Sequence, residues 1–100
     1  MQKAVNEFVL AHHLSCGAQA RYIDLTSEVG ELGKEILKGS DYGKTACRNT
    51  ENAEEELGDC LFSLLALACE MNIDARQALN RTLDKYETRF AEKGEISSGR

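Results

Sequence analysis

Residues 50–71, TENAEEELGDCLFSLLALACEM, decide the fold of this chain. Apolar side chains recur along the stretch at helical spacing, and acidic side chains fill its first turn, where the helix dipole favours them. Thr50 belongs to the residue types that cap a helix N-terminus. We therefore predict a helix that begins near Thr50. Its apolar stripe consists of Leu57, Cys60, Leu61, Leu64, Leu65, Ala68 and Met71.

Between Leu61 and Cys69 this predicted helix is apolar on every face except at Ser63. A helix of that kind is normally buried on several sides. A chain of 100 residues has few other elements to cover it. We therefore expect the chain to form a homo-oligomer, either a homodimer or a homotetramer.

Three other segments carry apolar residues at helical spacing. The first begins near Val5 and fades between Ser15 and Gly17. The second ends near Gly39, where a C-cap is expected. Its stripe consists of Tyr22, Leu25, Val29, Leu32 and Ile36. The last runs from Asp74, an N-cap residue type, to Gly94.

The composition supports an all-α fold. The chain has no Pro, no Trp, 8 Gly and 6% aromatic residues, so it lacks the turn chemistry of a many-stranded β-sandwich or barrel. We predict one domain over residues 1–100, folded as an antiparallel four-helix bundle. Its connections are short except for a loop at residues 39–49, and its tail frays from about residue 95 to 100.

Charge and cysteine content limit the class of protein further. The net charge is −5, which argues against stable binding of nucleic acids through their phosphates. The sequence has no long apolar run and no signal-peptide pattern at its start, so we expect a cytoplasmic protein with no membrane segment. The four cysteines form no C-x-x-C motif, and we expect them to be buried free thiols.

One short pattern occurs twice, as EVGEL at residues 28–32 and as ELGDC at residues 56–60. If the two helices pack antiparallel, their acidic pairs can face a shared cleft. These acids are Glu28, Glu31, Glu56 and Asp59. Gly30 and Gly58 each cost about 1 kcal/mol relative to Ala inside a helix. We expect the close approach of the two backbones, or of a ligand, to explain them.

Four carboxylates in one cleft cannot all stay ionised unless a positive charge joins them. Ligands that are all oxygen favour Mg²⁺, with Mn²⁺ as a substitute, whereas zinc sites usually recruit His or Cys. Such an ion would bind a polyphosphate and activate a water molecule. The alternative is that these acids are solvated on the helix faces. The repetition of the pattern, with a Gly in each copy, favours the metal site.

Residues 24–39, DLTSEVGELGKEILKG, and residues 51–68, ENAEEELGDCLFSLLALA, resemble the two halves of a known family signature. The family is the MazG-type all-alpha nucleoside triphosphate pyrophosphohydrolases, whose superfamily includes the dimeric dUTPases and phosphoribosyl-ATP pyrophosphohydrolase. The resemblance covers about residues 20–93. It implies hydrolysis of a nucleoside triphosphate to the monophosphate and pyrophosphate, with Mg²⁺ held by the four acids. Glu28, Glu31 and Glu35 are the catalytic candidates, Glu35 as a partner of the attacking water.

The resemblance also implies that a Lys and an Arg on the last helix hold phosphates, and Lys85 and Arg89 match them. Many members have an Asn two residues before that Lys, where this chain has Leu83. Phe8 and His12 are candidates for contact with the base, and Tyr86 for closing its pocket. The alternatives are a solvated basic stripe for the cations and ordinary packing for the rings.

The expected function is a Mg²⁺-dependent pyrophosphohydrolase that acts on an NTP or dNTP and clears non-standard or surplus nucleotides. One alternative is an enzyme of the same superfamily directed at dUTP or phosphoribosyl-ATP. Another is a helical interaction module without catalysis. The presence of all four acids speaks against the module, since the stability of a helical bundle does not require them.

Overall fold

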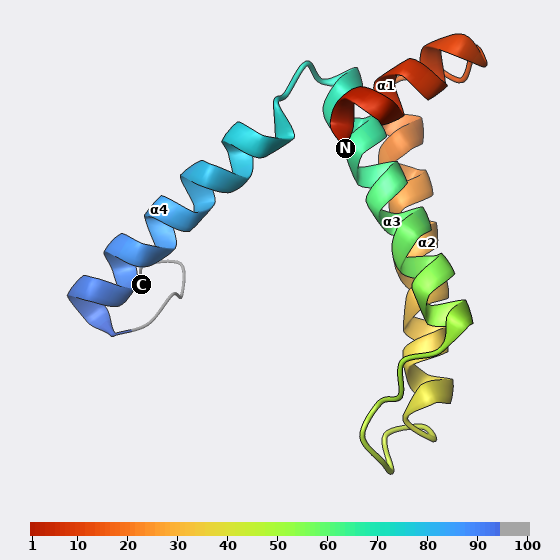
Figure 1. The fold of residues 1–100 in the computed structure, drawn as a ribbon, viewed down its shortest axis with the longest axis vertical. Coiled ribbons are helices and arrows are strands. Elements are labelled where there is room, and N and C mark those ends of the chain that lie inside the picture. Colours follow the sequence, from red (N-terminus) through yellow and green to blue (C-terminus); the bar gives the residue numbers. More distant parts are fainter. Residues whose placement is uncertain (95–100) are drawn as a thin grey trace.

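The computed structural model describes residues 1–94, and within them the chain forms four α-helices and no strand (Figure 1). This confirms the predicted all-α fold. The predicted frayed tail lies outside the described residues. The helices are α1 (Gln2–Ala11), α2 (Ala18–Gly39), α3 (Glu51–Glu70) and α4 (Ala75–Lys93).

The helix boundaries follow local capping chemistry. The Thr50 hydroxyl accepts a hydrogen bond from the Ala53 N–H at 3.0 Å, and the Asp74 carboxylate accepts one from the Gln77 N–H at 3.1 Å. Gly94 ends α4 in the left-handed conformation, with φ 73°. The N-caps and the end of α4 are therefore as the sequence predicts.

Gly39 has a different role from the one predicted. It is the last residue of α2, and Ser40 is the C-cap residue. A Cβ on Gly39 would lie 3.1 Å from the carbonyl oxygen of Arg48. The glycine therefore lets the returning loop pass close to the end of the helix.

The helices α2 and α3 lie side by side and antiparallel, and α1 packs against α3 (Figure 1). The buried apolar side chains are those of Val9, Leu65 and Ala66. Arg21 is buried as well. Its guanidinium donates a hydrogen bond to the carbonyl of Leu14 at 2.8 Å and lies 5.7 Å from the centre of the Phe62 ring. The arginine thereby links α2 to the end of α1 and to α3.

The side chains of Gln2 and Glu70 form hydrogen bonds at the connection between α3 and α4. The Gln2 side-chain amide donates to the carbonyl of Ile73 at 2.7 Å and accepts from the N–H of Ala75 at 2.8 Å. The Glu70 carboxylate accepts from the N–H of Cys16 at 3.0 Å. The connection between α3 and α4 is therefore held to the start of α1, and the end of α3 to the connection between α1 and α2.

From this connection α4 projects away from the other helices, so that the chain has the shape of a V (Figure 1). No residue of α4 is buried. The radius of gyration is 16.5 Å, whereas a compact chain of this length has about 13 Å. The predicted antiparallel packing is therefore seen for α2 and α3, while α4 stands apart from them. The predicted oligomer stays a prediction.

All four cysteines are free thiols, as predicted, but their predicted burial is wrong for two of them. Cys16 and Cys47 lie in the connections on either side of α2 and are exposed, while Cys60 and Cys69 are half-buried on α3. Among residues 1–94, no helix combines the length and hydrophobicity that a membrane crossing requires.

Candidate metal centre

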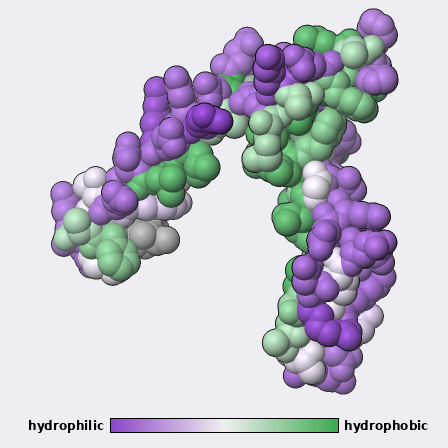
Figure 2. Space-filling model, in the orientation of Figure 1, coloured by the Kyte–Doolittle hydropathy of each residue, from purple (hydrophilic) through white to green (hydrophobic). Residues whose placement is uncertain are grey.

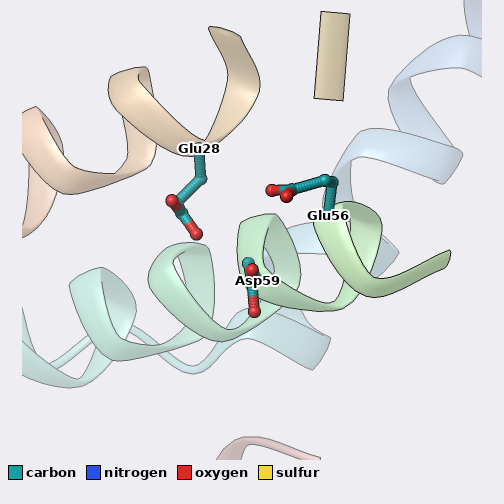
Figure 3. Close-up of side chains that lie close together, drawn as sticks. All are labelled: Glu28, Glu56 and Asp59. Atoms are coloured by element: carbon teal, nitrogen blue, oxygen red, sulfur yellow. The ribbon is translucent and has the colours of Figure 1, made fainter. Parts of the chain in front are cut away.

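Three acidic side chains meet where α2 faces the first half of α3 (Figure 3). One carboxylate oxygen from each of Glu28, Glu56 and Asp59 lies within 4.8 Å of the other two. Glu28 comes from α2, and the other two come from successive turns of α3. We call these three residues the acidic cluster. Glu28 and Glu56 are half-buried, and Asp59 is exposed.

The cluster follows from the repeated sequence pattern. An i, i+3 pair lies on one side of a helix, so Glu56 and Asp59 share a face of α3. The antiparallel pairing of α2 with α3 then brings Glu28 opposite them. Antiparallel packing of two glycine-containing acidic turns thus assembles carboxylates that are 28 or more residues apart in sequence.

The carboxylates of the cluster interact unfavourably when they are ionised. Partial burial, the charge of Asp59 and a side-chain hydrogen bond with Asp59 raise the pKa of Glu28 above its ordinary value. Partial burial and the charge of Asp59, followed by the charge of Glu28, raise the pKa of Glu56. The same surroundings raise the pKa of the Cys60 thiol, chiefly through burial and then through Glu28.

A bound cation would remove the repulsion that raises these pKa values. The donor atoms of the cluster are all carboxylate oxygens, the ligands that Mg²⁺ and Mn²⁺ prefer. The residues present therefore fit a hard divalent cation.

The structure brings together three of the four predicted metal ligands. Glu31, the fourth, is half-buried and pairs with Lys34 at 3.5 Å. Glu35, one turn further along α2, pairs with Lys38 at 3.6 Å. Both lie close enough for their charges to raise the pKa of Glu56. They therefore border the acidic cluster and extend its negative potential along α2.

The sequence predicts that Gly30 and Gly58 allow a close approach of the two backbones or of a ligand. In the structure, α2 and α3 do not approach each other closely at either residue. A Cβ on either residue would meet no atom within 4 Å, and the same holds for Gly33. The predicted backbone contact is wrong within this chain, because these positions face away from the packed seam between the helices. The space beside the two glycines is open.

The predicted phosphate-binding residues lie on the other arm of the V. Lys85, Tyr86 and Arg89 belong to α4, which projects away from α2 and α3 (Figure 1). The Lys85 ammonium lies 5.4 Å from the centre of the Tyr86 ring. A single chain therefore does not bring these residues to the acidic cluster.

The two predicted base contacts on α1 form a small aromatic group. The centres of the Phe8 and His12 rings lie 4.5 Å apart, and the Phe8 and Phe62 rings are nearly perpendicular with their centres 6.0 Å apart. Phe62 follows Asp59 by three residues, so this group lies one turn along α3 from the acidic cluster. The contact of Phe8 with Phe62 agrees with the packing alternative.

Arg21 is not among the residues that the sequence predicts for the site, yet it is buried and lies over the Phe62 ring of this aromatic group. A signal for it exists in the spacing. Arg21 lies seven residues before Glu28, so the two share a face of α2. A basic residue on the inward face of an amphipathic helix predicts that its side chain is buried and contacts the neighbouring helix.

Comparison with known proteins identifies the family of this chain. The chain is 40% identical over 68 residues to the uncharacterized protein YpjD of Bacillus subtilis (strain 168), which is 65% of this chain and 60% of that protein. The chain therefore spans about three fifths of the length of this relative. No solved structure matched the chain. Residues 18–92 match the model of the MazG nucleotide pyrophosphohydrolase domain, which places both halves of the acidic pattern within it. The chain therefore belongs to the MazG nucleotide pyrophosphohydrolase family.

Proposed function

We propose that this protein is a nucleoside triphosphate pyrophosphohydrolase that depends on Mg²⁺, with Mn²⁺ as a substitute. The acidic cluster carries the proposal, since Glu28, Glu56 and Asp59 present oxygen ligands from two helices at one point within a MazG domain. The reaction converts an NTP or dNTP and water into the monophosphate and pyrophosphate. Its role would be to clear non-standard or surplus nucleotides in the cytoplasm, where nucleotide pools are kept.

Glu28, Glu56 and Asp59 would hold the cation through one oxygen each. When bound, Mg²⁺ supplies positive charge to phosphate oxygens and lowers the pKa of a bound water. Glu31 would add a fourth carboxylate by turning away from Lys34. This change costs little, because the Glu31 side chain is 45% exposed and an ion pair in contact with solvent contributes at most about 1 kcal/mol.

Glu35 is the candidate partner of the attacking water. Its side chain is only 16% exposed and lies near the cluster. In this role it accepts a hydrogen bond from the water and orients it for attack on phosphorus. Lys85 and Arg89 would hold phosphate oxygens. Phe8, His12 and Tyr86 would contact the base.

The assay for this function measures pyrophosphate released from a panel of nucleoside triphosphates with Mg²⁺, including dUTP, and tests phosphoribosyl-ATP alongside them. We expect turnover of at least one compound. Preference for dUTP or phosphoribosyl-ATP would identify the alternative substrate class within the same superfamily.

The matched variants are Asp59→Asn and Glu55→Gln. Asp59→Asn removes a cluster charge and should reduce turnover by at least about a hundredfold. Glu55→Gln removes an exposed charge from the same helix outside the cluster and should leave turnover unchanged. No turnover on any compound would favour the interaction module instead. Undiminished turnover in Asp59→Asn would contradict the metal-site mechanism.

A further inference from the structure

We infer that the ion pair between Glu31 and Lys34 exchanges partners when the site fills. Glu31 leaves Lys34 to join the acidic cluster around a divalent cation, and the released Lys34 ammonium binds the pyrophosphate part of the nucleotide. The inference rests on the proposed function, because it adds a contact to the same site. Lys34 lies outside the candidates that the sequence predicts for that site.

The first observation is the place of the ion pair on α2. The Lys34 ammonium lies 3.5 Å from a carboxylate oxygen of Glu31. Glu31 follows Glu28 by three residues, so the two acids share a side of the helix. Partial burial and the charge of Asp59 are the larger causes of the raised pKa values of Glu28 and Glu56, and the charge of Glu31 adds to both. The ion pair therefore lies at the border of the acidic cluster.

The second observation is the direction of the lysine side chain. Side chains on a helix lean towards its N-terminus. Lys34 therefore extends back along α2, towards the turns that carry Glu31 and Glu28. The Cα of Lys34 lies six residues, or about 9 Å, beyond that of Glu28 along the helix axis, and the backward lean reduces this separation for the ammonium. Lys34 is thus directed towards the part of α2 where the proposed function places the phosphates.

The third observation is that both partners are free to move. The side chain of Lys34 is 64% exposed and that of Glu31 is 45% exposed. On the face shown in Figure 2, the half of α2 and α3 nearest their connecting loop is mainly hydrophilic. An ion pair in contact with solvent is weak. The two side chains can therefore change partners at little cost.

The fourth observation gives the space beside Gly30 a use. Gly30 lies four residues before Lys34, so the lysine side chain leans over the turn that contains the glycine. A Cβ on Gly30 would meet no atom within 4 Å. The missing side chain therefore leaves Lys34 room to turn away from Glu31.

The charges of the site favour such a release. Glu28, Glu31, Glu56 and Asp59 together carry four negative charges when ionised, and one divalent cation balances only two of them. The phosphates of a nucleotide add further negative charge. The cations of α4 lie on the other arm of the V (Figure 1). Lys34 supplies a positive charge from α2 itself, and its ammonium becomes available once Glu31 has left it.

A second lysine on α2 offers a matched control. Lys38 pairs with Glu35 at 3.6 Å, three residues away, as Lys34 does with Glu31. Glu35 is not a proposed ligand of the cation, and its side chain is only 16% exposed. We therefore expect this second pair to stay intact when the site fills.

The first test measures Mg²⁺ binding by calorimetric titration of the full chain with MgCl₂, without nucleotide. Lys34→Met frees Glu31 for the cation, so its Mg²⁺ affinity should exceed that of the wild type by about two- to fivefold, as the loss of an exposed ion pair allows. Lys38→Met removes a nearby positive charge but leaves Glu31 paired, so it should change the affinity less. Circular dichroism checks that each variant keeps its helices.

A double-mutant cycle separates the exchange of partners from the general effect of charge. Glu31→Gln should bind Mg²⁺ more weakly than the wild type, because three carboxylates remain. Adding Lys34→Met to Glu31→Gln should then change the affinity no more than Lys38→Met does. An equal rise in both backgrounds, or no rise in the wild-type background, would overturn the exchange.

The second test titrates the protein with sodium pyrophosphate at saturating MgCl₂. Lys34→Met loses a charged hydrogen-bond donor and should bind pyrophosphate at least about tenfold more weakly. Lys34→Arg keeps the charge and should bind nearly as tightly as the wild type. Lys3→Met, which breaks an exposed ion pair with Glu7 on α1, should match the wild type.

The two tests together give Lys34→Met a distinctive signature, since it should strengthen the binding of Mg²⁺ and weaken that of pyrophosphate. A purely structural role for Lys34 would not move the two affinities in opposite directions. Equal binding of pyrophosphate by Lys34→Met and the wild type, or none by the wild type, would overturn the phosphate contact.

Neither test requires turnover, so the inference and the proposed function fail separately. A wild type that binds Mg²⁺ and pyrophosphate as described but hydrolyses no nucleotide counts against the proposed function alone. An active wild type in which Lys34→Met leaves both affinities unchanged contradicts the exchange and leaves the proposed function intact.

Discussion

At the scale of single residues, the acidic cluster destabilises the fold that forms it. Ionised Glu28, Glu56 and Asp59 repel one another across the seam between α2 and α3, as the raised pKa values of the two glutamates show. Proteins keep such an arrangement where function requires it. The cost falls on the metal-free protein, and a bound cation removes it.

Glu28→Gln should therefore stabilise the metal-free protein and abolish its stabilisation by Mg²⁺. The substitution removes one charge from the cluster, so less repulsion remains and a ligand is lost. Thermal unfolding with and without Mg²⁺ measures both effects. Glu87→Gln, an exposed site on α4, serves as the control and should change neither. A lower melting temperature for metal-free Glu28→Gln would show that the cluster is not repulsive.

The pH dependence has a definite sign. A carboxyl group whose pKa is raised in the folded state binds a proton more tightly there than in the unfolded chain. Its contribution to stability is present below the ordinary pKa of 4.5 and is lost as pH rises through the raised pKa. The metal-free wild type should therefore lose stability above pH 4.5 more steeply than Glu28→Gln. Unfolding curves measured across that range check this, and identical slopes would contradict it.

The sequence predicts the acidic cluster well because the spacing of its members is local. Glu56 and Asp59 share a helix face by the i, i+3 rule, and the repeated pattern identifies Glu28 as their counterpart. The position of Glu31 is less predictable, because its carboxylate has a second partner three residues away in Lys34. Competition between such partners depends on side-chain rotamers, which periodicity does not determine.

At the scale of secondary-structure elements, the two acidic turns carry glycines that cost helix stability without any packing reason inside the chain. The space beside Gly30, Gly33 and Gly58 is open. Gly33 lies outside the glycine-centred acidic pattern, so it offers a control on the same helix as Gly30. Substitutions at Gly30 and Gly33 can therefore separate an effect on helix stability from an effect on turnover.

Gly30→Ala and Gly33→Ala should each stabilise α2 by up to about 1 kcal/mol, because Ala has the higher helix propensity. We expect turnover to fall only in Gly30→Ala, whose new methyl group would enter the open space that we expect a ligand to use. Denaturant unfolding and the pyrophosphate assay measure the two effects. Equal turnover in both variants would show that neither a substrate nor a partner chain uses the space at Gly30.

The helices themselves are predicted closely, since their ends depend on nearby residues such as Thr50, Asp74 and Gly94. Gly39 is the exception. Its role depends on the loop that returns to it from Arg48, a contact between residues distant in sequence.

At the scale of the whole molecule, the apolar third helix correctly indicates that one chain cannot cover its own hydrophobic surface. Leu57 and Leu64 stay exposed on α3, as do Leu79 and Phe90 on α4. The sequence does not predict the direction in which α4 projects. The connection before α4 is bonded to Gln2, a residue more than 70 positions away, and hydrophobic periodicity contains no information about such bonds.

If folding and assembly are coupled, the melting temperature should rise with protein concentration, because association stabilises the folded state by mass action. Calorimetric melting curves over about a hundredfold range of concentration measure this. Leu83→Glu should lower the melting temperature and remove the dependence. A wild type that melts at one temperature throughout the range would contradict the coupling.

The most direct test of the account as a whole is a calorimetric titration of the purified protein with MgCl₂ and with MnCl₂, without nucleotide. The wild type should give a saturable binding isotherm with each ion, whereas Asp59→Asn, shown by circular dichroism to be folded, should give only the heat of dilution. Equal binding by the two proteins, or none by either, would contradict the claim that Glu28, Glu56 and Asp59 form a site for a divalent cation.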